Sequence, residues 1–332
     1  MRSRIALFVA PLLLVSMLPG AASAAPTPDA RAAHRAQVLA YWTPARMRAA
    51  TPRDFTFDVV RGFQPVAKPG GGGTGGNVTG ASWTGGGAIL TGTGKVWFTM
   101  GGSDWICSGS VVTDAQTTQS IVLTAGHCAV ENDGTFATNW VFIPEFDTKP
   151  TYTCESTMYG CWVADALYAD KAFASAGSFD NTAVQHDWAF AVVGNDGNSN
   201  SQLEAAVGGS FAIQYSGVNT GQTLSAFGYP AAGKYRGMDL VYCRGPLGTD
   251  ANTGGTTWSM ACDMTGGSSG GPWVATSDPK AYASTILSSL NSYGYSGVKK
   301  MFGPKFNSTT QAVFNAADTG NLNASTVRVI FP

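Results

Sequence analysis

From about residue 81 onward, short apolar or alternating segments are separated by Gly, Asn and Asp. Regularly spaced short strands with such turn residues are typical of a β-sandwich or β-barrel. Gly101-Gly102 divides two of these segments and predicts a hairpin. In chain order, the expected strands are residues 95–100, 105–112, 120–124, 140–144, 188–193, 223–227 and 273–275. The pattern therefore predicts an all-β body.

Two segments have helical character instead. Residues 31–50 are rich in Ala, Arg and Met, contain no Gly, and have Pro44 as their one breaker. Residues 305–317 carry Phe306, Val313 and Phe314 at helical spacing, which predicts a short C-terminal helix. Between the first helix and the body, residues 69–76 contain six glycines and predict a linker.

The first 24 residues have the features of a secretory signal peptide. Arg2 and Arg4 precede an apolar run at 5–18, and Ala22-Ser23-Ala24 follows it. The run is short for a spanning helix, although a membrane anchor is the alternative interpretation. We expect an exported protein with no membrane segment after signal cleavage, a pro-segment with linker at 25–77 and one folded body at 78–332. Arg61, Lys68 and the linker itself all stay open as processing sites.

Charge is divided unevenly along the chain. The whole chain has a formal charge of −1, but residues 25–77 carry +4 and residues 78–332 carry −7. A basic leader on an acidic body suits a pro-segment that binds the body electrostatically, and a soluble spacer is the alternative. The acidic body argues against nucleic acid as a partner.

The chain has six cysteines, which in an exported protein predict three disulfides. Six cysteines allow fifteen pairings. Pairing of nearest neighbours gives Cys107–Cys128, Cys154–Cys161 and Cys243–Cys262. A metal site is not expected, because no Cys-x-x-Cys or His-rich cluster is present.

Three segments carry candidate chemistry. In Thr124-Ala125-Gly126-His127-Cys128, a histidine lies between an apolar strand and a cysteine, which would hold the ring rigidly. A rigid imidazole within reach of a nucleophile suits a general base. In His186-Asp187-Trp188, the aspartate begins an apolar strand, so its carboxylate needs a partner. An imidazole N–H is such a partner and would fix the ring's tautomer. Asp180 is the nearest substitute for Asp187.

The third segment, 262–273, contains Gly266-Gly267-Ser268-Ser269-Gly270-Gly271. Glycines around a serine let the backbone turn tightly and bring amide groups close to a substrate. Ser269 is the candidate nucleophile, and the amides of Gly267 and Ser269 are candidates for an oxyanion hole. Each segment alone is a weak signal, whereas His, Asp and Ser in this order on one exported β-rich chain are specific.

These three segments resemble the chymotrypsin/trypsin family of serine peptidases, and most closely its secreted bacterial branch, which includes glutamyl endopeptidases. The resemblance runs in order from about residue 82 to 332, with strong identity confined to the three motifs. It implies two six-stranded antiparallel barrels with the active site in the cleft between them. It further implies that His127 is the general base, Asp187 its orienting partner and Ser269 the nucleophile. The family's disulfide next to the histidine supports the pair Cys107–Cys128.

Two positions depart from the family pattern. Animal members have an Asp directly before the nucleophile that pairs with the freed N-terminus, and this chain has Ser268 there. Asp263 lies six residues before Ser269, where trypsin-like members bind Arg or Lys. Asp263 is thus either the floor of a pocket for basic residues or a structural carboxylate. The segment 288–293 is expected to form the wall that pairs with substrate, with Ser288 and Asn291 as substrate-binding candidates.

The sequence therefore predicts a secreted serine endopeptidase that forms an acyl-enzyme, needs no cofactor or metal, and cuts polypeptides after basic residues. A peptidase fold with a decayed site that only binds, or an endopeptidase that prefers Glu, are the alternatives. A serine esterase of the α/β-hydrolase type would have the order Ser, Asp, His, which is not the order here.

Overall fold

The computed structural model describes residues 27–58, 62–65, 79–147, 152–199 and 201–332. The expected signal peptide and glycine linker, together with Arg61 and Lys68, lie outside the described residues. Within the described residues, no helix combines the length and the apolar character that crossing a membrane requires.

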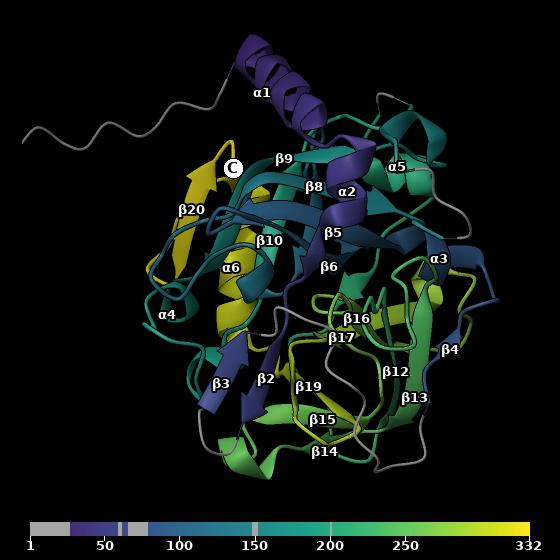
Figure 1. Cartoon of the computed structure of the whole chain (residues 1–332), viewed down its shortest axis with the longest axis vertical. Coiled ribbons are helices and arrows are strands. Elements are labelled where there is room, and N and C mark those ends of the chain that lie inside the picture. The colour runs from purple at the N-terminus through teal and green to yellow at the C-terminus, as the bar shows by residue number, and fades with distance from the viewer. Residues whose placement is uncertain (1–26, 59–61, 66–78, 148–151, 200) are drawn as a thin grey trace, which may run out of the picture.

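The first half of the body is a closed antiparallel barrel (Figure 1). Its strands pair in the order β6-β5-β8-β9-β10-β7, and β7 returns to β6 to close it. The bounds are β5 (Thr93–Met100), β6 (Ser103–Val112), β7 (Ser120–Thr124), β8 (Thr138–Pro144), β9 (Trp162–Asp170) and β10 (Ala189–Val193). β20 (Thr326–Ile330) is added on β9.

The second half of the body consists of two facing sheets. One has the order β11-β17-β16-β12-β13-β4, and the other joins β14, β15, β19 and β18. Contacts of β13 with β15 and of β17 with β19 bring the sheets together. The molecule thus has the two-barrel fold of chymotrypsin-like proteins, as expected. The bounds are β4 (Ala81–Ser82), β11 (Ala212–Ile213), β12 (Thr223–Gly228), β13 (Val241–Pro246), β14 (Gly248–Thr249), β15 (Thr257–Ala261), β16 (Pro272–Thr276), β17 (Thr285–Leu290), β18 (Tyr293–Tyr295) and β19 (Lys300–Pro304).

All seven expected strands are present, with shifts of a few residues at their ends. The expected hairpin joins β5 to β6 through Gly101 and Gly102, both of which have positive φ. The expected C-terminal helix is α6 (Ser308–Thr319), which Asn307 begins with a capping box. The other short helices of the body are α3 (Gly87–Gly92), α4 (Lys171–Ala174) and α5 (Leu203–Val207).

The helical character expected over 31–50 is present. It is divided into α1 (Pro28–Tyr41) and α2 (Pro44–Ala49), with the break at Trp42 and Thr43, directly before the expected breaker Pro44. Thr43 caps α2 by accepting from the amide of Arg46, and Pro44 occupies the first turn. Proline is favourable there because its missing N–H has no helical partner to lose. Pro44 therefore starts a new helix.

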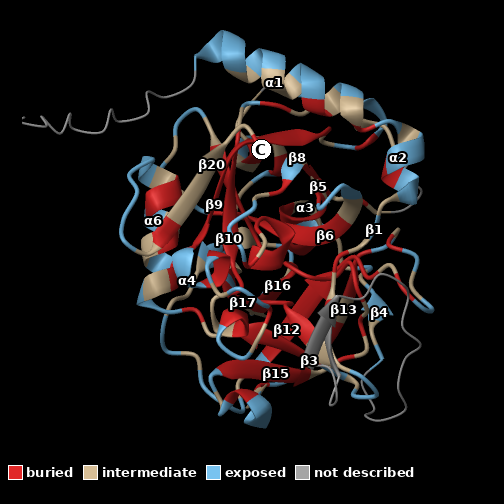
Figure 2. Ribbon diagram, turned by 60° about the vertical axis from the view of Figure 1, so that its left-hand side comes forward, coloured by how far each residue is buried: buried red, intermediate tan, exposed pale blue. Residues whose placement is uncertain are grey.

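The leader packs on the body. α1 lies against β8 and β9, with its outer face exposed (Figure 2). Val38, Trp42 and Met47 are buried members of the same hydrophobic core as the first barrel. After α2, the chain forms β1 (Thr51–Pro52), β2 (Phe55–Asp58) and β3 (Gly62–Pro65). β1 pairs with β6, and β2 pairs with β18. These leader strands therefore join one sheet from each half of the body.

Candidate active site

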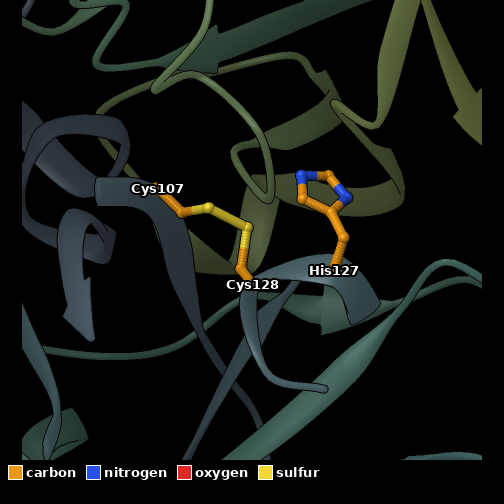
Figure 3. Close-up of side chains that lie close together, drawn as sticks. All are labelled: Cys107, His127 and Cys128. Carbon is orange, nitrogen blue, oxygen red and sulfur yellow. A yellow bond between two sulfur atoms is a disulfide. The ribbon is translucent and has the colours of Figure 1, made fainter. Parts of the chain in front are cut away.

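His127 lies in η1 (Gly126–Cys128), which is separated from the end of β7 by the single residue Ala125. The next residue, Cys128, is bonded to Cys107 of β6. Figure 3 shows the imidazole beside this disulfide. The ring is 1% exposed, so both strand and disulfide restrict its position. The sulfur atoms of Cys107 and Cys128 lie close to the His127 ring. They are bonded to each other and are therefore not the thiolates that bind metal ions.

Asp187 orients this histidine through two hydrogen bonds. The amide and Nδ1 of His127 each donate to one oxygen of the Asp187 carboxylate at 2.8 Å. The hydroxyl of Ser292, the residue directly before β18, also donates to Asp187. Asp187 has no exposed surface, and these donors stabilise its buried charge. With Nδ1 as donor, a neutral ring has its acceptor lone pair at Nε2.

Ser269 lies on the tight loop before β16, which both halves of the body hold in place. The amide of Ser108 on β6 donates to the Ser269 carbonyl at 2.7 Å. Asn291 donates from its side chain to the Ser268 carbonyl at 2.9 Å. Gly270 has φ of +84°, and a Cβ there would lie 2.3 Å from the Ser108 carbonyl oxygen. Only glycine fits this contact.

The hydroxyl of Ser269 donates to the leader. Its partner is Oδ1 of Asp54, at 3.3 Å. His127 Nε2 is buried and has no hydrogen-bond partner among the described residues. Burial raises the pKa of the Asp54 carboxyl to about 6, against the opposing effect of His127. Asp54 thus lies near both the expected nucleophile and the expected base.

The expected oxyanion-hole residues lie on the same loop. Gly267 has φ of +95°, and a Cβ there would lie 2.8 Å from the Tyr229 carbonyl oxygen. Among the residues that the structure describes, neither the Gly267 nor the Ser269 amide donates a hydrogen bond. Both amides are therefore available to an acceptor.

The three expected substrate-binding side chains have partners inside the protein. Asp263 accepts from the Gly80 amide, Lys234 Nζ and Tyr235 Oη, at 2.6–2.7 Å. These donors keep the pKa of Asp263 below its usual value against the effect of burial. Asn291, 1% exposed, bonds Trp273 and two backbone carbonyls. Ser288 has no exposed surface and donates to Gln214. The structure does not bring these three polar groups to the Ser269 hydroxyl.

Asp180, the substitute considered for Asp187, begins a separate turn. Its carboxylate accepts from the amides of Thr182 and Ala183. Two further polar groups at the site, Ser292 and Asp54, were not expected from the sequence. Ser292 could have been found from its place before Tyr293-Gly294 at the end of the expected wall, whereas no local signal marks Asp54.

All three nearest-neighbour disulfides are present: Cys107–Cys128, Cys154–Cys161 and Cys243–Cys262. Disulfides of this kind persist in oxidising compartments outside the cytosol. They are consistent with export of the chain.

Solved structures of known proteins resemble this chain. The protease Anisep from Arthrobacter nicotinovorans is 37% identical, with a TM-score of 0.59 over 70% of this chain and 97% of that one. The thermostable serine protease AL20 from an extremophilic microorganism is 36% identical, with a TM-score of 0.60 over 70% of this chain and 100% of that one.

A Glu endopeptidase structure shares the fold, with a TM-score of 0.53 over 75% of this chain and 99% of that one, at 19% identity. No protein-family model and no curated protein sequence matches the chain.

Proposed function

Because this chain belongs to the chymotrypsin/trypsin-like family of serine peptidases and is a serine endopeptidase, we propose that His127, Asp187 and Ser269 form its catalytic triad. The observation that carries this assignment is the buried His127–Asp187 pair, with Nε2 of the same ring unpartnered. Asp54 accepts a hydrogen bond from the Ser269 hydroxyl and interacts electrostatically with His127, which supports a site that includes both proposed residues.

The proposed reaction is acyl transfer to Ser269. The serine hydroxyl attacks a peptide carbonyl carbon while His127 Nε2 accepts its proton, and Asp187 stabilises the imidazolium that forms. The amides of Gly267 and Ser269 hold the oxyanion. His127 then gives the proton to the leaving amine, and water hydrolyses the acyl-enzyme by the same steps.

The second part of the proposal is that the enzyme is exported as a precursor whose leader binds its own body. Four leader arginines support it, because each is ion-paired with a carboxylate of the body. The pairs are Arg31–Asp165, Arg35–Asp196, Arg46–Asp104 and Arg53–Glu131. Burial raises the pKa of Asp165 and of Asp196, and the arginines oppose this effect.

Cleavage after basic residues stays a prediction, and the contacts of Asp263 weigh against it. A substrate Arg or Lys would have to replace Lys234, which already neutralises this carboxylate. The Glu endopeptidase neighbour is too distant in sequence to indicate a Glu preference, because at 19% identity it shows the fold alone.

One experiment tests activity and preference together. Processed protein is incubated with a mixed peptide library, beside a Ser269→Ala variant with the same circular dichroism. We expect cleavage by the parent and none by the variant, and Asp187→Asn should lower kcat by about four orders of magnitude. Undiminished cleavage by Ser269→Ala would refute the triad. The residue before each cut shows whether Arg and Lys, or Glu, is preferred.

A further inference from the structure

The leader crosses the site between the two halves of the body. β1 runs parallel to β6, with Thr51 opposite Trp105 and Pro52 opposite Ile106. β2 runs parallel to β18, with Thr56 opposite Gly294. Residues 53–55 therefore connect a strand of the first barrel to the wall beside Ser292. Peptides commonly bind proteins by adding a strand to a sheet edge in this way.

Arg53 fixes one side of this crossing. Its Nε donates to the His127 carbonyl oxygen at 2.8 Å, and its Nη2 donates to Glu131 at 2.6 Å. Its backbone amide donates to the Ile106 carbonyl at 3.1 Å. The guanidinium is buried, and charge-assisted bonds to Glu131 compensate its lost hydration.

Phe55 fixes the other side. Its ring stacks on Phe179 with a centroid distance of 4.0 Å and meets the His127 ring edge-on at 5.3 Å. It is 6% exposed. Aromatic pairs of this geometry add specific orientation to apolar burial. Arg53 and Phe55 thus anchor the residues on either side of Asp54 next to His127.

Asp54 is held directly over the nucleophile. Its Oδ1 accepts from the Phe55 amide at 3.0 Å and from Ser269 Oγ at 3.3 Å. Gly266 leaves room for this approach, because a Cβ there would lie 3.0 Å from Cβ of Asp54. A side chain at position 266 would therefore force Asp54 to shift.

We propose that residues 51–58 are a built-in inhibitor, in which the Asp54 carboxylate takes the hydrogen bond of the Ser269 hydroxyl that His127 Nε2 needs for catalysis. This inference rests on the triad proposed above. The ligand class that the cleft accepts in this mode is a peptide with an acidic residue between Arg and an aromatic residue.

The chemistry explains why such a segment inhibits and is not cut at Asp54. Ser269 faces a carboxylate, whose negative charge opposes attack by an oxygen nucleophile and which has no leaving amine. The available amides of Gly267 and Ser269 receive no carbonyl oxygen from the described leader residues. No bond forms or breaks in this state. Inhibition ends when the segment leaves the cleft.

The test uses precursors without the signal peptide. Parent, Asp54→Ala and Asp54→Asn are assayed with a fluorogenic peptide, and mass spectrometry verifies that each chain is intact before and after. We expect a latent parent and a gain in activity of about 10- to 100-fold in Asp54→Ala, which loses the hydrogen bond to the Ser269 hydroxyl. Asp54→Asn keeps a side-chain acceptor and should stay at least as latent as the parent, because it lacks the charge whose burial disfavours leader binding. Asp29→Asn, in the exposed first turn of α1, is the matched control and should stay latent.

All four precursors are then processed with immobilised trypsin, which can cut after Arg61 and Lys68, and are assayed again. Equal activity of the processed forms shows that each variant folds. Processed parent that stays inactive after the cleaved leader has been removed would refute the proposed function. Active processed forms together with equal activity of intact parent and intact Asp54→Ala would refute the inhibitory role alone.

A second test does not depend on folding of the variants. A synthetic peptide with the sequence of residues 51–58 is added to processed parent enzyme. We expect competitive inhibition, recovery of the peptide uncut at Asp54, and inhibition about 10-fold weaker or more for the Asp54→Ala peptide. Equal inhibition by both peptides, or cleavage of the parent peptide next to Asp54, would overturn the proposal.

Discussion

Asp54 and Asp187 are carboxylates of the same site in opposite situations. Asp187 receives donors from His127 and Ser292 and has no exposed surface. Asp54 loses hydration in the cleft, and among the described residues its hydrogen-bond donors are the Ser269 hydroxyl and the Phe55 amide. Burial is therefore the largest influence on the pKa of Asp54. Ionisation of Asp54 should weaken binding of the leader.

Leader binding should accordingly depend on pH. The pKa of Asp54 rises from 3.8 to about 6 when the leader is bound. The stabilisation is complete below pH 3.8 and is lost as pH rises through 6, and His127 and Asp187 are the titratable groups that interact with Asp54. This pH-dependent stabilisation is measured by urea unfolding of the precursor, in a Ser269→Ala background that prevents self-cleavage. Between pH 4 and pH 7, Asp54→Asn should gain about 2 kcal/mol in unfolding free energy relative to its parent. Identical pH profiles of the two proteins would contradict this expectation.

At the scale of elements, η1 carries the proposed general base and is tied to β6 by the Cys107–Cys128 disulfide. The same strand holds the Ser269 loop through the amide of Ser108. β6 therefore positions both the expected base and the expected nucleophile. β17 and β18 provide the opposite wall, where Asn291 fixes the Ser269 loop and Ser292 fixes Asp187.

Removal of this disulfide should affect stability and catalysis together. Cys107→Ala with Cys128→Ala opens a loop of 21 residues, which should cost about 3 kcal/mol of unfolding free energy. His127 next to it should lose its fixed position, so kcat/KM should fall. Cys154→Ala with Cys161→Ala is the matched control, because it opens a loop of 7 residues away from the triad. It should lower the melting temperature with little change in kcat/KM. Equal loss of kcat/KM in both variants would disprove this role.

At the scale of the whole molecule, the leader and the body share one core. Val38, Trp42, Met47 and Phe55 of the leader pack with residues of the first barrel. Arginines of α1 and α2 pair with carboxylates of the body, as the opposite charges of the two parts suggested. Apolar burial therefore provides affinity, and the charges assist association.

The charge contribution predicts a salt dependence. The dissociation constant of the processed leader from the body should rise several-fold between about 50 mM and 500 mM NaCl, because ions screen partly exposed pairs. Arg31→Gln with Arg35→Gln should weaken binding at low salt and reduce the salt dependence. Fluorescence titration measures each affinity. A dissociation constant that is independent of salt would rule out this contribution.

The sequence by itself determined the strands and the three motifs of the site, because both are encoded locally. Alternation predicted β5, β6, β7 and β10, and tight Gly-Ser and His-Cys segments marked Ser269 and His127. The sequence marked Pro44 as a breaker, and the structure shows that this proline also begins a new helix. The strand β9 was not among the expected strands, although it is buried throughout like β7 and β10.

Only the tertiary structure decided which distant groups meet. Asp54 and Ser269 are separated by 215 positions, and Ser292 and Asp187 by 105. No local pattern encodes such pairs, because packing of the two barrels and of the leader across them sets the distances. The same packing places the Asp263 carboxylate against Lys234 and Tyr235, whereas its spacing from Ser269 suggested the floor of a pocket for basic residues. The sequence thus predicted the residues proposed for the chemistry of the site, and the fold decided which distant groups lie beside them.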